Sequence, residues 1–520
     1  MIDFDLVTFA YSGAPTRPVL HDFSLNIAAG EQVAVIGGNG SGKTTLGLLL
    51  CGILKPASGT ITIAGHAPIP GGDGRRIGFL FQDPDNGLVA TTVEREVAFS
   101  LENRNLSSAL IRPVVDRTLD RFGLEPYRRR LVWHLSGGEK QRLALAGLLA
   151  DRADILFLDE PESFLDWAGA ERLSETLHEL RQSDSQLTII RITQFAQVAD
   201  RYPRIILMGR GKVLKDGPPE EVFGDEAILT EAGLRPPLRF LKPRSAPSQP
   251  AVRSGLEFRG KTRLAIEKLS FRFEAEDTAF RIEDLSLTID GGEIVALVGR
   301  SGSGKSTLAQ LICGLYRPDS GTIRFEPASA RAVMSFQQPE RQFFLDTAFD
   351  EVAYGIRKAF DKGPALEQAV RRSMQICGLD FDLFSRRDPN SLSGGEARRL
   401  AFAIVVALGA KLIIFDEPTC ALDEAGISAF RKLAGELQRA GTAVVIISHN
   451  GDIVAELADR VILMDGGRVI HESEPIPFFA SAESKGILAV PEVISYQRER
   501  FGDVRSTRVA DIFDVAEFSA

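Results

Sequence analysis

Short, continuous apolar runs recur along the chain and predict buried strands. Residues 32–36 read Gln-Val-Ala-Val-Ile, and residues 294–298 read Ile-Val-Ala-Leu-Val. Two further apolar runs, residues 155–158 and 412–415, are each followed directly by an aspartate. Runs of this length without alternation are typical of strands that are covered on both faces, as in a parallel sheet. Helical segments expected from Leu46 and from Leu308 alternate with these strands, which indicates an α/β fold.

Other stretches complete this outline. Residues 59–63 predict a further short strand, whereas residues 92–134 and 347–390 lack strand signals and predict a helical insert. Residues 400–410 form the longest apolar segment, which is well short of the eighteen or more residues that cross a bilayer. We interpret this segment as a buried helix and expect no membrane span.

The same pattern occurs twice. Four pairs of residues are separated by 262, 255, 257 and 257 positions, namely Lys43/Lys305, Gln82/Gln337, Ser136/Ser393 and Asp159/Asp416. Such regular spacing predicts two copies of one domain. We expect a first domain with a short appendage at residues 1–238, a linker at 239–263, a second domain at 264–470 and a C-terminal appendage at 471–520.

The stretch between the two copies is basic. From Arg235 to Arg263 it holds eight Lys or Arg residues and one Glu, so its charge is 8 − 1 = +7. A solvated linker rich in Pro and Ser explains this composition. Attraction to an anionic membrane surface is the alternative.

Composition narrows the class of protein. A chain of 520 residues can bury two cores, and 44% hydrophobic with 25% charged residues is ordinary for a globular protein. The net charge of −9 gives no support for a nucleic-acid partner. The first residues lack the features of a signal peptide. Cys51 and Cys313 occupy matching positions on the helices expected from Leu46 and Leu308, and we interpret them as packed core thiols. The four cysteines indicate no metal or disulfide framework, which fits a reducing cytoplasm.

Two glycine-rich loops carry the first chemical signal. Residues 37–44 read Gly-Gly-Asn-Gly-Ser-Gly-Lys-Thr, and residues 299–306 read Gly-Arg-Ser-Gly-Ser-Gly-Lys-Ser. Each follows a predicted strand and precedes a predicted helix, which is the context of a phosphate-binding loop. Backbone N–H groups and the helix N-terminus attract phosphate oxygens. Lys43 and Lys305 can reach the β and γ phosphates, while Thr44 and Ser306 can ligate Mg²⁺.

Two acid pairs and two short motifs add to this signal. Asp159-Glu160 and Asp416-Glu417 each end an apolar strand, where one carboxylate can anchor Mg²⁺ and the other can orient or deprotonate a water. Leu-Ser-Gly-Gly-Glu occurs at residues 135–139 and 392–396, each time before an apolar helix. A plain serine cap explains one such motif, but not the same five residues upstream of both acid pairs.

With these motifs the chain resembles two fused ATP-binding-cassette (ABC) ATPase domains over nearly all of both halves. The resemblance implies an α/β fold with two tandem P-loop nucleotide-binding domains. Each would have a RecA-like core, an antiparallel β subdomain and a helical subdomain. It also implies ATP hydrolysis, with ATP and Mg²⁺ as cofactors.

The resemblance assigns roles to the residues that match the family motifs. Those expected to act in hydrolysis are Glu160, Glu417, His449, Gln194, Gln82 and Gln337. Those expected to bind nucleotide are Tyr11, Gly37, Asn39, Gly40, Gly42, Lys43, Thr44, Thr45, Phe273, Gly299, Ser301, Gly302, Gly304, Lys305, Ser306, Thr307, Ser136, Gly137, Gly138, Glu139, Ser393, Gly394, Gly395, Glu396, Asp166 and Asp423. Those expected to bind Mg²⁺ are Thr44, Gln82, Asp159, Ser306, Gln337 and Asp416.

One position departs from the family pattern. Ile192-Thr193-Gln194 stands where the family has its switch histidine, whereas the second copy has His449 there. A glutamine can donate a hydrogen bond to phosphate but cannot carry a positive charge. We therefore expect the first site to bind ATP and to hydrolyse it more slowly than the second.

In this family two domains close head to tail. Each phosphate loop then faces the Leu-Ser-Gly-Gly-Glu motif of the other domain, which is called the signature motif. On this basis Lys43, Asp159 and Glu160 would work with Ser393 and Gly395. Lys305, Asp416 and Glu417 would work with Ser136 and Gly138. The ATPase pair is expected to form within one chain, and pairing between two chains stays open.

The segments after Gln82 and Gln337 are similar to the paired ATPase subunits of energy-coupling factor (ECF) importers for vitamins and metal ions. Residues 82–86 read Gln-Asp-Pro-Asp-Asn, and residues 337–344 read Gln-Gln-Pro-Glu-Arg-Gln-Phe-Phe. Gly87 departs from that group's usual glutamine, so the first groove is the less certain match.

This resemblance implies partners and a location. The partners would be a transmembrane coupling subunit and a membrane-embedded substrate-binding subunit, with the chain at the cytoplasmic face of the cell membrane. A tandem sugar-importer ATPase is the alternative within transport, although its second site is usually degraded. A ribosome-associated tandem ABC factor is the alternative outside transport, although such factors usually carry a long charged helical linker.

Overall fold

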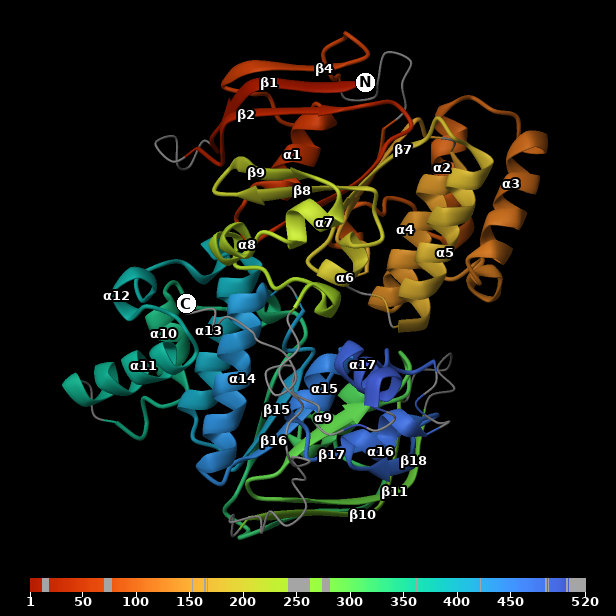
Figure 1. The fold of residues 1–520 in the computed structure, drawn as a ribbon. Helices are drawn as coiled ribbons and strands as arrows, with labels where there is room; N and C mark the ends of the chain where they lie inside the picture. Colours follow the sequence, from red (N-terminus) through yellow and green to blue (C-terminus); the bar gives the residue numbers. More distant parts are fainter. Residues whose placement is uncertain are drawn as a thin grey trace. The chain divides into compact units, whose positions relative to one another are not determined.

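The computed structural model of the protein describes residues 1–11, 18–69, 77–151, 153–162, 165, 167–241, 262–273, 281–360, 363–420, 422–481, 484, 486–501 and 504. The chain divides into two compact units, Met1–Phe240 and Leu241–Ala520 (Figure 1). Most of the predicted basic linker, residues 242–261, lies outside the described residues. The exact domain and appendage limits stay predictions.

The central sheet of the first unit has six strands. Five are parallel and the edge strand β9 is antiparallel to β8. Both β6 and β7 are buried throughout. The continuous apolar sequence of β6 predicts its burial, whereas β7 also buries Thr188 and Arg191. Across the sheet the order is β5(Ile77–Leu80), β6(Ile155–Asp159), β7(Thr188–Ile192), β3(Gln32–Gly37), β8(Arg204–Gly209) and β9(Lys212–Gly217).

A smaller antiparallel sheet and helix α1 (Lys43–Leu50) complete this core. The sheet order is β2(Leu20–Ile27), β1(Ile2–Phe9) and β4(Ser58–Ile63). Phe4 and Phe23 from this sheet share one hydrophobic cluster with Leu46 of α1 and Phe157 of β6. The cluster thereby anchors the helix that follows the glycine-rich loop between the two sheets.

The predicted helical insert of the first unit has a hydrophobic core of its own. Val97, Leu119 and Leu143 belong to this cluster and are buried. The insert consists of α2(Val93–Asn103), α3(Ser108–Arg121) and α4(Gly137–Ala150), with 3₁₀ turns at Pro84–Asn86, Glu125–Tyr127 and Val132–His134. The remaining helices are α5(Trp167–Ser183), α6(Ala196–Ala199), α7(Pro219–Phe223) and α8(Glu226–Ala232), and a last 3₁₀ turn spans Leu238–Phe240.

The second unit repeats this architecture. Its six-stranded sheet has the order β14(Ala332–Ser335), β15(Leu412–Asp416), β16(Ala443–Ile447), β12(Ile294–Val298), β17(Arg460–Asp465) and β18(Arg468–Ser473). Its antiparallel sheet has the order β11(Arg281–Asp290), β10(Arg263–Arg272) and β13(Ser320–Glu326). Its helices are α9(Lys305–Ile312), α10(Ala348–Tyr354), α11(Pro364–Ile376), α12(Phe381–Phe384), α13(Gly394–Ala407), α14(Glu424–Arg439), α15(Gly451–Leu457), α16(Pro475–Ala480) and α17(Glu492–Phe501), with 3₁₀ turns at Pro339–Gln342 and Pro389–Ser391. The predicted fold class is therefore confirmed in both copies.

Three local predictions need correction. The helices after the glycine-rich loops begin at Lys43 and Lys305, three residues before Leu46 and Leu308, because glycines 42 and 304 turn the backbone directly into them. The apolar segment 400–410 belongs to α13, which ends at Ala407. Cys51 and Cys313 lie at the C-caps of α1 and α9, just past the helix ends.

Burial raises the pKa of both of these thiols to about 12. None of the helices in the described part of the chain has the length and apolar content that crossing a membrane requires.

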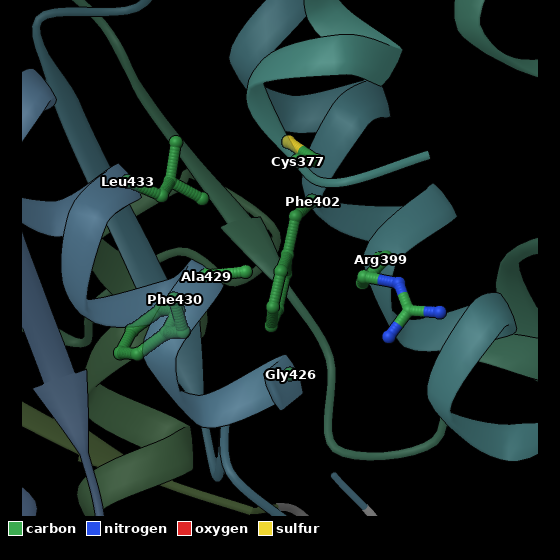
Figure 2. A pocket seen from close by; sticks show the side chains of 7 residues that line it. All are labelled: Cys377, Arg399, Phe402, Gly426, Ala429, Phe430 and Leu433. Atoms are coloured by element: carbon green, nitrogen blue, oxygen red, sulfur yellow. The ribbon is translucent and has the colours of Figure 1, made fainter. Parts of the chain in front are cut away.

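A narrow pocket lies between α13 and α14 in the second unit (Figure 2). Cys377, the C-cap of α11, is one of the lining residues, and burial raises the pKa of that thiol. Figure 2 shows the Phe402 ring beside Ala429 of α14. The lining is mostly apolar, and it consists of Cys377, Arg399, Phe402, Gly426, Ala429, Phe430 and Leu433. We interpret this pocket as a gap in the packing between α13 and α14.

Candidate nucleotide site

The loop between β3 and α1 is folded around one lysine. The Lys43 ammonium donates to the carbonyl oxygens of Gly37 at 2.8 Å and Gly38 at 3.0 Å, and to Ser41 Oγ at 3.4 Å. Lys43 is 6% exposed, whereas Asn39 and Gly40 at the tip of the loop are exposed. The loop therefore presents open backbone around one buried positive charge, which suits an anionic ligand.

The second unit has the same arrangement. The Lys305 ammonium donates to the carbonyl oxygens of Gly299 at 2.8 Å and Arg300 at 2.9 Å, and to Ser303 Oγ at 3.5 Å. Gly304, like Gly42, caps its helix in the left-handed region, with φ values of 103° and 100°. Thr45 and Thr307 follow in the first turn, and Ser301 and Gly302 are exposed at the tip of the loop.

Two acids follow directly from β6. Asp159 is 1% exposed and Glu160 is 7% exposed. Burial raises the pKa of Asp159 to about 6, although a hydrogen bond from Thr44 and the charge of Lys43 oppose the shift. Burial raises the pKa of Glu160 to about 7, and the neighbouring Asp159 carboxylate contributes. A carboxyl group that titrates near neutral pH is suited to accept a proton.

Glu160 is held from two sides. Gln82 Nε2 donates to Glu160 Oε2 at 2.8 Å, and Gln194 Nε2 donates to Glu160 Oε1 at 2.6 Å. The backbone of Glu160 has φ 45°, and Glu417 repeats this with φ 49°. Both copies therefore keep a non-glycine residue in the left-handed region at this acid, which is typical of functional sites.

The second unit differs around its acid. Ser306 Oγ donates to Asp416 Oδ2 at 2.8 Å. His449 Nε2 lies 3.4 Å from Glu417 Oε1, and the His449 backbone N–H donates to Glu417 Oε2 at 3.4 Å. Burial raises the pKa of both carboxyls, and the charge of Asp416 adds to the shift of Glu417. Gln337 donates no side-chain bond that parallels Gln82, but its carbonyl oxygen accepts from Arg398 at 2.7 Å.

The two signature motifs begin α4 and α13. Ser136 and Ser393 are exposed caps, and each forms a capping box with the glutamate three residues later. Glu139 accepts the backbone N–H of Ser136 at 2.7 Å, and Glu396 accepts that of Ser393 at 2.8 Å. Gly137 and Gly394, the first residues of the two helices, are exposed, whereas Gly138 is half-buried and Gly395 is buried. A phosphate would be favoured at these helix N-termini.

Of the two aromatic residues predicted to bind nucleotide, Tyr11 contacts the helix that follows its glycine-rich loop. The Tyr11 hydroxyl is 3.2 Å from Thr45 Oγ1, and the Tyr11 ring is 43% exposed and packs edge-on against Phe9. Phe273 packs edge-on against Phe271 and Tyr316. Asp423 caps α14 by accepting the N–H of Gly426 at 2.9 Å. Asp166 lies outside the described residues.

The acid site also fits a divalent cation that arrives with phosphate. Asp159 Oδ2 is buried without a hydrogen-bond partner, so an oxygen ligand points into the site beside Thr44. Over the described ranges, no cluster of three or more His, Cys, Asp and Glu side chains could hold a metal ion. A hard cation here would need phosphate oxygens to complete its coordination.

Comparison with known proteins assigns the family. The family described as ABC transporter matches residues 20–163 and 282–420, one match in each unit. The chain belongs to this family. A protein of Methanosarcina mazei, by name an ABC transporter ATP-binding protein, is 31% identical over 93% of this chain and 90% of its own length. Because the family matches once in each unit, this protein is a tandem ABC ATPase that binds and hydrolyses ATP.

Two solved structures are also similar. A chain in a model of ribosome-bound archaeal Pelota and ABCE1 has a TM-score of 0.65 with 19% identity, covering 94% of this chain and 84% of that one. At that identity it shares the fold alone. The structure of cbiO1 from Clostridium perfringens, part of the transporter complex cbiONQ, is 34% identical. Its TM-score is 0.38, and the match covers 44% of this ABC chain and 92% of that one.

Sequence reasoning missed two groups of residues. Glu96 and Glu351 are buried glutamates that hold the loops after Gln82 and Gln337. Glu162 and Arg191 form a buried ion pair behind Gln194. A comparison of the two copies could have pointed to this pair, because Glu162 and Arg191 are charged where the second copy has the neutral residues Thr419 and Ile446.

Proposed function

We propose that this chain is the ATP-hydrolysing motor of an ECF-type membrane importer for a small nutrient, a vitamin or a metal ion. A transmembrane coupling subunit and a membrane-embedded substrate-binding subunit would be its partners, at the cytoplasmic face of the cell membrane. Relatives that are ABC transporter ATP-binding proteins by name over almost the whole chain support a transport role. The observation that carries the proposal is an exposed aromatic pair in the segment that follows Gln337.

This pair is Phe344 and Tyr354 in the second unit. They are 65% and 58% exposed, and their rings meet edge-on with centroids 5.0 Å apart. Glu351 is 3% exposed and accepts the backbone N–H groups of Phe344 at 2.5 Å and Leu345 at 2.6 Å. A buried acid thus holds an apolar tip toward solvent, which suits an apolar helix of a partner.

The first unit builds the same feature with smaller residues. Val89 and Phe99 are 63% and 42% exposed. Glu96 accepts the backbone N–H groups of Val89 at 2.9 Å and Ala90 at 2.6 Å. We propose that both tips grip the coupling subunit and that the first tip, where Gly87 departs from the group's pattern, grips it more weakly.

The ATPase chemistry follows from the loop and acid geometry. Lys43 and Lys305 would hold the β and γ phosphates within the glycine-rich loops. Mg²⁺ would be held by Thr44, Gln82 and Asp159 in one site and by Ser306, Gln337 and Asp416 in the other, and when bound it neutralises phosphate charge. Glu160 and Glu417 would accept the proton of the attacking water, and His449 would contact the γ phosphate.

We further propose that each site is completed by the signature motif of the other copy within the same chain. Ser393 to Glu396 would close the Lys43 site, and Ser136 to Glu139 would close the Lys305 site. Tyr11 and Phe273 would stack on adenine, and the aspartates Asp166 and Asp423 would lie at the contact between copies. No nucleic-acid partner is proposed.

Two other functions remain testable alternatives. A tandem sugar-importer ATPase would usually have a degraded second site, whereas here the second copy is the regular one. A ribosome-associated factor shares this fold, but its usual long charged helical linker differs from the Pro-containing segment 239–263.

Affinity purification from detergent-solubilised membranes of the native cell tests the proposal. The unaltered chain should retain integral membrane proteins, and the double variant F344S/Y354S should lose most of them. Ile470→Ser is the matched control, because Ile470 is 53% exposed but lies on β18, at the opposite edge of the sheet from β14, the strand that precedes Gln337. Ribosomes in place of membrane proteins, or equal retention by both variants, would contradict the proposal.

A further inference from the structure

A buried ion pair lies behind the switch position of the first unit. Arg191 Nη2 donates to Glu162 Oε2 at 3.0 Å, and the two side chains are only 3% and 6% exposed. The Arg191 guanidinium also hydrogen-bonds Tyr202. Charges buried this deeply persist only when they are paired and hydrogen-bonded.

The second unit has neutral residues at the same places. Arg191 of β7 lies opposite Leu158 of β6, and Ile446 of β16 lies opposite Phe415 at the same register of β15. The residue after Pro161 is Glu162, whereas the residue after Pro418 is Thr419. The fold therefore works without this ion pair, and its presence is particular to the copy that lacks the switch histidine.

The pair is connected to both neighbours of Gln194. The Thr193 hydroxyl donates to Glu162 Oε1 and accepts the backbone N–H of Phe195 at 3.1 Å. Thr193 is fully buried. Through Thr193, Glu162 thus fixes the turn 193–195 that carries Gln194.

That turn places the Gln194 amide on the proposed base. Together with Gln82, Gln194 occupies both carboxylate oxygens of Glu160, at 2.8 Å and 2.6 Å. A water that is to transfer its proton to Glu160 must hydrogen-bond to one of these two carboxylate oxygens. An amide held on each oxygen competes with the water for that hydrogen bond.

We propose that the Glu162–Arg191 pair is a positioning element that holds the Gln194 amide on Glu160 and thereby slows hydrolysis at the first nucleotide site. The inference rests on the proposed role of Glu160 as the base. On this inference, slow hydrolysis at the first site depends on Glu162 and Arg191 as well as on the replacement of histidine by Gln194.

The test transplants the residues of the second copy. Changing either charge alone would leave the other buried and unpaired, which destabilises a protein. The double variant E162T/R191I avoids this and is made in an E417Q background, so that hydrolysis reports the first site. Single-turnover hydrolysis of ATP with Mg²⁺ should become about tenfold faster, which corresponds to about 1.4 kcal/mol. The KM for ATP should stay unchanged.

A second pair of variants keeps the test independent of folding. Thr193→Val keeps the ion pair but cuts its link to the turn, so it should also accelerate hydrolysis. Thr193→Ser is the matched control, because it keeps the hydroxyl and matches Ser448 of the second copy, and it should stay slow.

A double-mutant cycle tests the role of Gln194. If the pair acts through Gln194, E162T/R191I should have no effect in a Q194A background. Equal acceleration with and without Gln194, or no acceleration by E162T/R191I and Thr193→Val, would overturn the inference. Failure of the proposed function looks different: an E160Q/E417Q variant would then still hydrolyse ATP.

Discussion

Gly299 shows how closely the phosphate loop approaches its neighbouring strand. Its φ is 149°, and a Cβ there would overlap the carbonyl oxygen of Met464 in β17. Gly302, three residues later, has φ 79° with open space around it. The two glycines are equally required by the sequence pattern, but for different physical reasons.

We expect Gly299→Ala to lower the free energy of unfolding of the second unit by about 2–4 kcal/mol, because backbone must move to admit the methyl group. Gly302→Ala should cost only about 1–2 kcal/mol, the strain of a left-handed residue. Denaturant unfolding without nucleotide measures both. Equal losses would show that the contact with Met464 relaxes freely.

At the scale of elements, short loops are held by buried acceptors from the helices that follow them. Glu351 of α10 and Glu96 of α2 each accept two backbone N–H groups of the preceding loop. Without them, the loop would have to leave those N–H groups to water, and its exposed apolar tip would lose a defined position. The helix thus determines where the tip points.

Glu351→Ala should therefore destabilise the second unit by about 1–3 kcal/mol, because two N–H groups lose their acceptor. Hydrogen exchange at Phe344 and Leu345 should speed up at the same time. Glu367→Ala is the control, since its ion pair with Arg371 is largely exposed and should be worth less than about 1 kcal/mol. Unchanged exchange in Glu351→Ala would argue against this role.

At the scale of the whole molecule, duplication has produced two unequal sites. Glu160 accepts two amides, whereas Glu417 faces an imidazole. An imidazole can carry a positive charge near phosphate, and an amide cannot. The two sites therefore share a loop and an acid pair but differ in the side chain that contacts the second acid, Gln194 in one and His449 in the other.

We expect Glu417→Gln to lower steady-state ATP hydrolysis by about 100-fold or more, the usual loss on removing a catalytic base. Glu160→Gln should cause a much smaller loss, because the first site contributes little turnover. ATP binding by both variants serves as the control for folding. Equal losses would contradict the proposed asymmetry.

The motifs alone determined much of this protein. Two phosphate loops, two acid pairs and two signature motifs at matching spacing predicted the duplicated α/β fold, the ATPase family and the unusual Gln194. These features are local in sequence, because a glycine-rich turn between a strand and a helix binds phosphate mostly through its own backbone.

Only the tertiary structure decided what lies behind those motifs. Glu162 and Arg191 are 29 residues apart and meet because β6 and β7 are adjacent strands. Their sequence neighbours do not mark them as partners, since a buried charge is recognised by what surrounds it in space. The sequence named Gln194 as the departure, and the packing of β6 against β7 showed what holds it.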